Sequence, residues 1–399
     1  MEEKKTYDFS ISTCRKDTNA EKYTKREELF GTDDVQPVWV ADMDIDTPDF
    51  VINAVKERLN HPIVGYEEIP DSAFLAQIKW MKDEHNVDFS LEDMFYSHSV
   101  VASMSVAIDA FSKVGEKVIV QTPIYPPFFH SVMQHDRKLL KNPLKQVDDG
   151  SYIFDIDNLK AQIDKDTKLL LLCSPHNPVG RVWKREELKQ ILDICLENNV
   201  VVFSDEIHSD LVYSPNKHIP FASLSEKARD ITVTAIGVGK TFNMAGFSMS
   251  SVAIPNKSLR EKFSKVYKRV HFADGNALSH VAFESAYIDG KVWLEELKVH
   301  IYKNYTLLKE LCEKYPKLIK ITPIEATYLA WLDCKGMNLS NKKLRAFFIN
   351  EAKLGLNPGL GFGREGSGFM RLNFAISSAK MSEVLNKLDK ALANKTKGL

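Results

Sequence analysis

Cysteine is scarce in this sequence, and the few cysteines form no pattern typical of a metal site or a disulfide framework. The five are Cys14, Cys173, Cys195, Cys312 and Cys334. Their odd number, their wide spacing and the lack of any CxxC pair argue against zinc binding and against disulfide bonds. We therefore expect small buried hydrophobic side chains in a reducing compartment.

Long apolar runs and an excess of one charge are also missing. No run is long enough to span a bilayer, and residues 1–8 carry charges with no apolar stretch behind them, so we expect a soluble, cytoplasmic protein without a membrane partner. The 53 Lys and Arg residues nearly balance the 54 Asp and Glu residues. Such a chain has no net field to hold nucleic acid, which leaves a small molecule as the expected partner.

The middle of the chain alternates short β-branched runs with amphipathic stretches. This alternation is typical of an α/β fold in which helices cover a mainly parallel sheet. The expected strands are Lys117–Gln121, Leu169–Cys173, Val200–Ser204, Ile231–Ile236 and Ser251–Ile254. A crossover helix is expected between the second and third of these, where apolar residues from Leu188 to Cys195 repeat at helical spacing.

After about Ala286 the pattern changes to long charged helices, which indicates a second, smaller α+β domain. A chain of 399 residues that is 44% hydrophobic can fill two cores. We expect an N-terminal arm (1–48), a large domain (49–286) and a small domain (287–399), with the boundary inside a long helix near Ser285–Val292. A strand is expected at Tyr328–Leu332, and the glycine-rich segment Gly359–Gly368 is either a mobile flap or a flexible loop.

Polar side chains follow two of the expected strands, at the edge where open α/β sheets bind their ligands. Ser174–Gly180 presents Asn177, whose amide can contact a ligand oxygen, although this segment is also typical of an ordinary turn. Ser204–His208 places Asp205 where a carboxylate could pair with a protonated pyridine nitrogen. Taken alone, such an aspartate is more often a helix cap.

A third segment, Gly237–Gly246, follows another expected strand and contains Lys240. A lysine that is partly desolvated near a sheet edge can act as a Schiff-base nucleophile, because desolvation favours its neutral amine. The Gly-Lys-Thr run also resembles the end of a Walker A loop. The first glycine of that pattern is replaced by Thr234, which argues against a nucleotide hydrolase.

A fourth segment, Ser97–Ser103, has the small residues of a helix start that leads into an apolar repeat. Free backbone N–H groups at such a helix N-terminus bind phosphate. Any helix start would look similar, so this segment only supports the other three.

Together these segments resemble fold-type I pyridoxal-phosphate enzymes of the class I/II aminotransferase superfamily. Within that group they resemble the cystathionine β-lyase, cystalysin-like branch, which consists of MalY/PatB-like carbon–sulfur lyases. The segments that carry the resemblance are Val40–Met43, Val64–Tyr66, Thr122–Tyr125, Ser174–Trp183, Ser204–His208, Lys240–Gly246, Ala326–Leu329 and Arg371–Asn373. The resemblance implies a mainly parallel seven-stranded sheet in the large domain, pyridoxal 5'-phosphate as cofactor, and a homodimer with shared active sites to which the N-terminal arm contributes.

The resemblance also implies the roles of the residues around the cofactor ring. Lys240 would form the internal aldimine and then move the α-proton of the substrate, and Asp205 would pair with the pyridine nitrogen. Tyr125 would stack on the ring, while Asn177, with His208, would lie near its phenolic oxygen.

Phosphate and substrate contacts are carried over in the same way. Ser99, Val100 and Val101 would bind the cofactor phosphate. Tyr66 would reach the phosphate of the neighbouring subunit and contact the substrate. Arg371, together with Asn177, would bind the substrate, because a guanidinium suits a two-pronged salt bridge to the α-carboxylate. Without its flanking match, this arginine would be interpreted as a surface residue.

The implied reaction is an α,β-elimination that converts cystathionine or cysteine to a thiol or hydrogen sulfide, pyruvate and ammonia. An aminotransferase on the same fold is the first alternative, and a pyridoxal-phosphate protein that mainly binds a regulatory partner is the second. Ser248 stands where aminotransferases place an arginine, which favours the lyase. Gly237 and Gly239 replace hydroxyl residues usual before the lysine, so the phosphate would lose side-chain donors. Ser99 and Pro126 also depart from the residues common at their positions.

Overall fold

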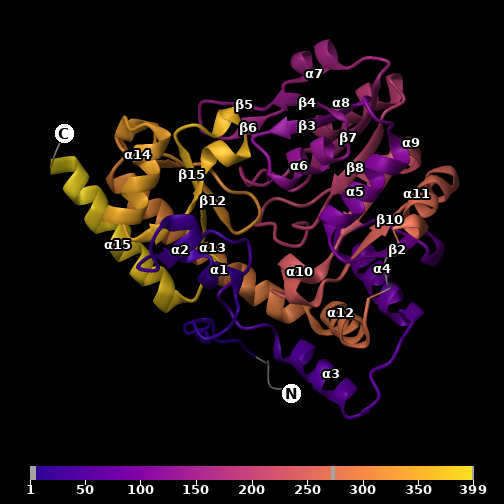
Figure 1. Ribbon diagram of the computed structural model, residues 1–399, viewed down its shortest axis with the longest axis horizontal. Helices are drawn as coiled ribbons and strands as arrows, with labels where there is room; N and C mark the ends of the chain where they lie inside the picture. Colours follow the sequence, from indigo (N-terminus) through magenta and orange to yellow (C-terminus); the bar gives the residue numbers. More distant parts are fainter. Residues whose placement is uncertain (1–5, 271–274, 398–399) are drawn as a thin grey trace.

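A computed structural model describes residues 6–270 and 275–397 of the chain. At its centre lies a sheet with seven strands in these ranges (Figure 1). Their spatial order is β2 (Met94–Ser97), β10 (Ser250–Ala253), β9 (Thr232–Ile236), β8 (Val201–Asp205), β7 (Thr167–Cys173), β3 (Lys117–Thr122) and β4 (Lys138–Pro143). β10 is antiparallel to both its neighbours, and the strands from β9 to β4 are parallel. The expected mainly parallel seven-stranded sheet is therefore confirmed.

Alternating side chains of the central strands fill two cores, one on each face of the sheet. On β7, Leu169 and Leu171 belong to one core and Leu170 and Leu172 to the other. The first core also takes residues from α5 (Val100–Phe111), α6 (Pro127–Gln134) and α11 (Lys257–Arg269). The second takes residues from α7 (Ile156–Gln162), α8 (Arg185–Glu197) and α9 (Glu226–Ile231). Because both faces are covered, these strands consist of continuous apolar runs.

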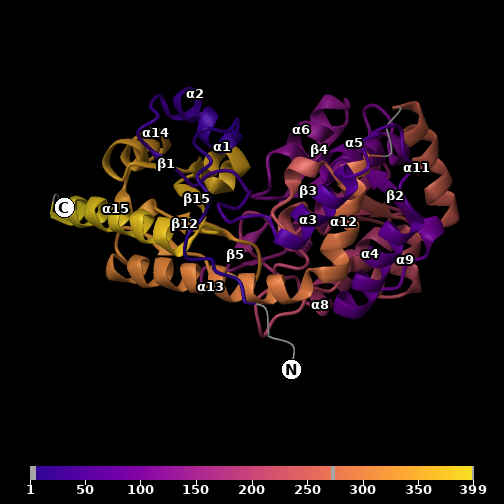
Figure 2. The ribbon, with the colours of Figure 1, turned by 90° about the horizontal axis from the view of Figure 1, so that it is seen from below.

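A smaller lobe lies beside this sheet and contains the last part of the chain (Figure 2). Its antiparallel sheet has the order β11 (Lys320–Ile321), β12 (Leu329–Asp333), β15 (Phe369–Asn373) and β14 (Asn357–Pro358). The helices α13 (Lys291–Lys314), α14 (Asn341–Ala346) and α15 (Ser378–Lys397) contribute apolar residues to the same core as this sheet. The predicted strand at Tyr328–Leu332 is confirmed by β12.

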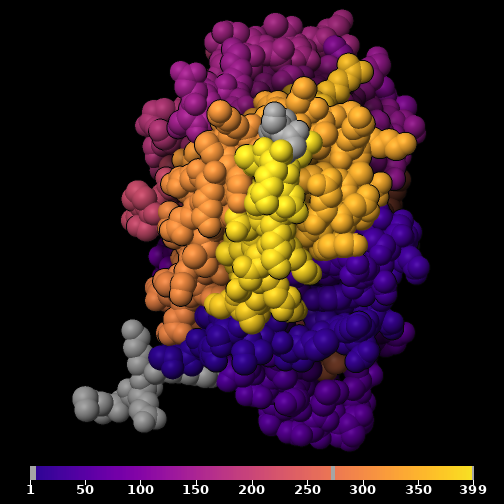
Figure 3. Space-filling view, turned by 90° about the vertical axis from the view of Figure 1, so that its left-hand side faces the viewer, coloured from indigo at the N-terminus to yellow at the C-terminus, as the bar shows by residue number. Residues whose placement is uncertain are grey.

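The N-terminal arm packs on the smaller lobe. It contains α1 (Glu21–Thr24), α2 (Arg26–Phe30) and β1 (Gln36–Pro37), and β1 pairs with β13 (Leu354–Gly355). Asp44 is buried between Lys22 and Lys380, whose Nζ atoms lie 3.4 and 3.1 Å from its carboxylate. Burial acts to raise the pKa of Asp44, but the two lysines outweigh it and hold this pKa at about 2. Figure 3 shows the arm in indigo beside the yellow α15, so the two ends of the chain stabilise each other.

Two strands of the large sheet, β2 and β4, were not predicted individually. Both lie at the edges of the sheet, where burial on both faces no longer selects a continuous apolar run. β4 places two lysines around a pair of leucines and ends in proline, a sequence that edge strands tolerate.

The single long helix expected near Ser285–Val292 is wrong, because the chain forms α12 (Ala277–Asp289) and α13 with Gly290 between them. A Cβ atom at Gly290 would lie 2.2 Å from the carbonyl oxygen of Ala286 and 2.3 Å from the Phe242 ring. Close packing therefore requires glycine at this break. The division into domains at 48 and 286 stays a prediction.

The segment Gly359–Gly368 forms two short 3₁₀ turns, with Phe362 buried and its carbonyl bonded to Ile124 N at 2.9 Å. Four cysteines are buried as expected, but Cys14 is exposed on the N-terminal arm, so the prediction was wrong for that residue.

Candidate active site

A cavity of about 180 Å³ lies at the carboxyl ends of the central strands. Tyr125, Asn177, Asp205, His208 and Lys240 line it together, although they come from four separate segments of the chain. Because parallel strands end at one edge of a sheet, residues far apart in sequence meet there. The structure therefore brings together the five side chains predicted around the cofactor ring.

Lys240 lies in a short helix, α10 (Val238–Thr241), directly after β9. Its Nζ donates a hydrogen bond to the carbonyl oxygen of Ala41 at 2.6 Å. Burial lowers the pKa of Lys240 to about 8, although Asp42 and Asp205 act in the opposite direction. With this pKa, part of the lysine population carries a neutral amine at physiological pH, and only the neutral amine can act as a nucleophile or a base.

Asp205 ends β8 and no helix follows it directly, so it is not a helix cap. Its Oδ1 accepts a hydrogen bond from Ile207 N at 3.1 Å. Among residues 6–270 and 275–397, no Lys, Arg or His forms an ion pair with it. Burial raises the pKa of Asp205 to about 7, partly offset by the Ile207 bond and by Lys240. A buried carboxylate without a cation is suited to hold a cationic ligand.

Arg371 is buried on β15 and contacts the cavity through Asn177. Its Nη1 donates to Asn177 Oδ1 at 3.0 Å, and its Nη2 donates to Asn357 Oδ1 at 2.8 Å and to Trp39 O at 3.0 Å. The guanidinium also lies over the ring of Phe362, 4.8 Å from its centre. Burial lowers the pKa of Arg371 to about 10. The interpretation as a surface arginine is therefore wrong.

The start of α5 forms one wall of the cavity. Ser99 caps this helix, because its Oγ accepts a hydrogen bond from Ala102 N at 3.1 Å. Val100 and Val101 line the cavity in the first turn, where backbone N–H groups lack partners inside a helix. An anion is favourable at this position because of these groups and the helix dipole.

His208 and Tyr125 complete the walls. Burial lowers the pKa of His208 to about 3, so its imidazole is neutral, and its ring packs edge-on against Tyr328 at 6.0 Å. Among the described residues, its Nδ1 has no hydrogen-bond partner. Burial raises the pKa of Tyr125, which keeps its phenol protonated.

Two lining residues, Ala41 and Ser250, and the neighbouring Tyr328 were not predicted. Ala41 accepts hydrogen bonds from both Lys240 and Tyr328, whose hydroxyl lies 2.9 Å from its oxygen. Tyr328 belongs to a segment that carried the family resemblance, so that signal could have identified it. Ser250 lines the cavity from β10, and its sequence surroundings give no sign of this position.

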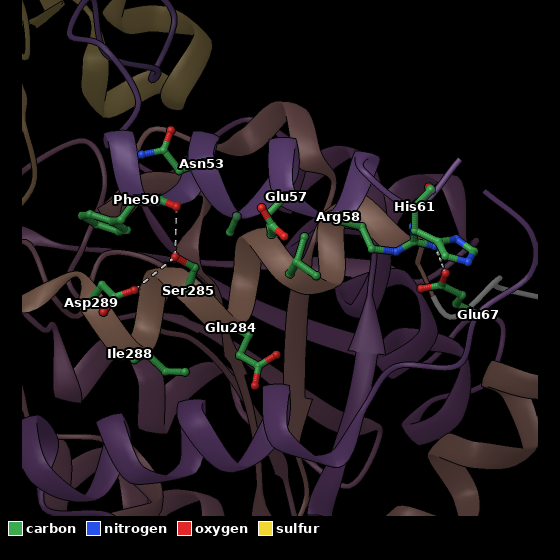
Figure 4. Close-up of a pocket in the computed structure, with 12 residues that line it drawn as sticks. Phe50, Asn53, Glu57, Arg58, His61, Glu67, Glu284, Ser285, Ile288 and Asp289 are labelled. Atoms are coloured by element: carbon green, nitrogen blue, oxygen red, sulfur yellow. Dashed lines mark hydrogen bonds and ion pairs between the residues drawn. The ribbon is translucent and has the colours of Figure 1, made fainter. Parts of the chain in front are cut away.

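Tyr66 does not lie in the cavity of its own chain. It is fully exposed on the loop between α3 (Asp49–Leu59) and α4 (Asp71–His85). Arg58 holds this loop through a hydrogen bond to Ile63 O at 3.2 Å and an ion pair with Glu67. Figure 4 shows Arg58 and Glu67 at one end of a groove between α3 and α12. The contact of Tyr66 with a neighbouring subunit stays a prediction.

Within the part of the chain that the structure describes, no group of three or more His, Cys, Asp or Glu side chains could hold a metal ion. Across the same residues, none of the helices combines the length and apolar character needed to cross a membrane.

Comparison with known proteins places this geometry in a family. Residues 40–388 match the model of aminotransferase class I and II. The chain is 41% identical over 378 residues to cystathionine beta-lyase PatB of Bacillus subtilis (strain 168), covering 94% of this chain and 97% of that protein. Protein MalY of Escherichia coli (strain K12) is 32% identical over 381 residues, covering 94% of this chain and 96% of that protein.

Solved structures agree with the sequence comparison. Cystalysin from Treponema denticola, whose crystal structure contains a pyridoxal 5'-phosphate cofactor, superposes with a TM-score of 0.94 at 35% identity. The match covers 98% of this chain and all of that chain. This chain belongs to the family of class I and II aminotransferases.

Proposed function

We propose that this protein is a pyridoxal-phosphate-dependent carbon–sulfur β-lyase acting on cystathionine- or cysteine-type amino acids. The observation that carries the proposal is one cavity lined by Lys240, by Asp205 without a cation partner among the described residues, and by Asn177 bonded to Arg371. The names of the relatives support it, since PatB is a cystathionine β-lyase. The products are a thiol or hydrogen sulfide, pyruvate and ammonia.

The residues of the cavity fit pyridoxal 5'-phosphate at both ends of that molecule. Asp205 is buried, its pKa is raised, and it has no ion-pair partner among the described residues. A protonated pyridine nitrogen would supply the missing ion pair. The first turn of α5, with Ser99 to Val101, would bind the phosphate. When bound, this cofactor supplies an electron sink that makes the α-proton of an amino acid acidic.

The chain's own residues would supply orientation and proton transfer. Arg371 and Asn177 would bind the α-carboxylate of the substrate. This contact would hold Cα in a fixed position relative to the base that takes its proton. Lys240, with a pKa of about 8, would take the α-proton. Loss of a thiolate from Cβ leaves aminoacrylate, which water converts to pyruvate and ammonia.

A test separates the lyase from an aminotransferase, the activity named in the family description. Ser248 has a left-handed backbone (φ 51°) at the end of a 3₁₀ turn, and it provides no guanidinium where aminotransferases carry one. Purified protein should release pyruvate from cystathionine with no keto acid added. Lys240→Ala is the control and should release none. Pyruvate formation only after addition of a keto acid would refute the lyase.

We further propose a homodimer in which Tyr66 completes the partner's site. Its full exposure on a loop braced by Arg58 supports this. Mixing two inactive variants, Lys240→Ala and Tyr66→Ala, should restore about a quarter of the active sites, because one site of each mixed dimer then has both residues. No recovery in a confirmed mixed dimer would contradict shared sites. The expected cytoplasmic location stays a prediction.

A further inference from the structure

Two buried pairs of a carboxylate and a histidine lie next to the candidate site without lining its cavity. Asp210 accepts from His85 Nε2 at 2.7 Å, and Glu206 accepts from His218 Nε2 at 2.8 Å. The side chains of both pairs are at most 7% exposed. Two buried carboxylates so close together are stable only when several hydrogen bonds compensate their charge. The proposed reaction gives these four residues no role.

Asp210 connects directly to the residue that follows Lys240. Its Oδ2 accepts a hydrogen bond from Thr241 Oγ1 at 2.9 Å, while Oδ1 accepts one from Trp80 Nε1 at 2.9 Å. Thr241 is fully buried. Burial acts to raise the pKa of Asp210, but the bonds from His85, Trp80 and Thr241 outweigh it and hold the pKa below its ordinary value. Asp210 is therefore an ionised anchor for α10.

Glu206 makes an equivalent anchor beside Asp205. Its Oε1 accepts from Ser204 Oγ at 2.8 Å and from Phe221 N at 3.0 Å. Glu206 and Ser204 flank Asp205 in the chain, so the end of β8 is fixed on both sides. The rings of His85 and His218 meet edge to face with centroids 5.5 Å apart. The anchors of Lys240 and of Asp205 thus belong to one contiguous buried block.

We propose that Thr241 is a positioning residue: through Asp210, it holds the amine of Lys240 at a fixed place relative to Asp205. This inference rests on the proposed function. Neither the hydroxyl of Thr241 nor the carboxylate of Asp210 lines the cavity, so both act through Lys240. The helix α10 is only four residues long, so it has few internal hydrogen bonds to fix its orientation. The bond from the Thr241 hydroxyl to Asp210 supplies an additional fixed point.

The matched variants are Thr241→Val, which removes the hydroxyl at nearly constant volume, and Thr241→Ser, which keeps it. The control is Thr232→Val, because Thr232 is also fully buried, lies on the strand that leads to Lys240, and bonds Ala228 O at 2.5 Å away from the cavity. Each variant is purified with pyridoxal phosphate bound. The readouts are kcat and KM for pyruvate release, the pH midpoint of the visible absorption band without substrate, and the melting temperature.

Thr241→Val should lower kcat about tenfold or more with KM nearly unchanged, since misplacement of a catalytic group slows the chemical step. Its absorption midpoint should shift by about 0.5 pH unit, because the surroundings of the lysine amine change. Thr241→Ser should restore both values, and Thr232→Val should change neither. A loss of melting temperature alone in Thr241→Val, with kcat and midpoint as in the wild type, would overturn the proposal.

Two further outcomes are decisive. If Thr241→Val does not fold, His85→Gln tests the same anchor from α4 and should shift the midpoint in the same way; an unchanged midpoint there overturns the proposal. Because the midpoint is read without substrate, it supports or refutes the role of Thr241 even if the substrate class proves different. A wild-type protein with no visible band would refute the proposed function and the positioning role together.

Discussion

Asp205→Asn should stabilise the cofactor-free protein at alkaline pH while removing most of its activity. The carboxylate is buried and has no ion-pair partner among the described residues, so its charge is unfavourable until a cationic ligand binds. Asparagine has nearly the same shape, and its side chain can still accept the hydrogen bond from Ile207 N. We therefore expect Asp205 to lower the stability of the cofactor-free protein, although the same carboxylate is needed to bind a cationic ligand.

The magnitude follows from the pKa of Asp205. An unfolded chain loses this proton near the ordinary value of 3.8 and the folded chain near about 7, so the folded protein binds the extra proton between these values. Its stability therefore falls as pH rises through this window, and the full penalty applies above it. At 1.36 kcal/mol for each pH unit, the penalty is about 4 kcal/mol. The asparagine of the variant would not titrate, so the advantage of the variant should grow from near zero at low pH to this value.

Urea unfolding of cofactor-free protein, followed by tryptophan fluorescence at several values between about pH 4.5 and 8.5, measures this difference across the window in which the carboxyl titrates. Asp210→Asn is the matched control, because Asp210 is equally buried but has a lowered pKa. That control should be less stable than the wild type at the alkaline end of the range. A pH-independent difference for Asp205→Asn, or destabilisation at the alkaline end, would refute the assignment of Asp205 as an unpaired buried carboxylate.

Three further predictions concern binding, packing and pH. Arg371→Lys should raise KM about tenfold, because lysine cannot form the two-pronged contact; steady-state rates measure this, and an unchanged KM would contradict the carboxylate role. Gly290→Ala should lower the free energy of unfolding by about 2–3 kcal/mol in urea titrations, since its Cβ would lie 2.2 Å from Ala286 O; full stability would show that α12 and α13 can shift apart. The rate at which cofactor-free protein takes up pyridoxal phosphate, followed by absorbance, should rise with pH through a midpoint of about 8, because the Lys240 amine becomes neutral there. A midpoint near the ordinary value of 10.5 would contradict the desolvation of that amine.

The sequence predicted the central strands well because burial on both faces gives them an unmistakable apolar pattern. Leu169–Cys173 and Val200–Ser204 match β7 and β8 within two residues. The polar residues near their carboxyl ends, Asn177 beyond β7 and Asp205 as the last residue of β8, could be assigned to one site because parallel strands end at a common edge. Periodicity gave no comparable signal for β4, whose exposed edge position permits lysine beside leucine.

The contacts between distant segments could not be predicted from pattern alone. Arg371 binds Asn177, 194 positions away, and Lys240 binds Ala41, 199 positions away. Sequence resemblance suggested that Arg371 belongs to the site, but burial and its two asparagine partners are properties of the folded chain. The roles of Asp210 and Thr241 were missed for a related reason: neither residue type signals an anchor unless their side chains are seen to meet.

The glycine at position 237 illustrates how the structure changes an inference drawn from one motif. In sequence, Gly237 and Gly239 imply a loss of hydroxyl donors near the phosphate. In space, a Cβ at Gly237 would lie 2.9 Å from the Cβ of Ser250, so β10 occupies the room that a side chain at 237 needs. Ser250 lines the cavity and carries a hydroxyl, which now bonds Ser97 O at 3.1 Å. Glycine at 237 is therefore required by the close approach of β10 to the residue that follows β9, and a hydroxyl residue there would need β10 to move away.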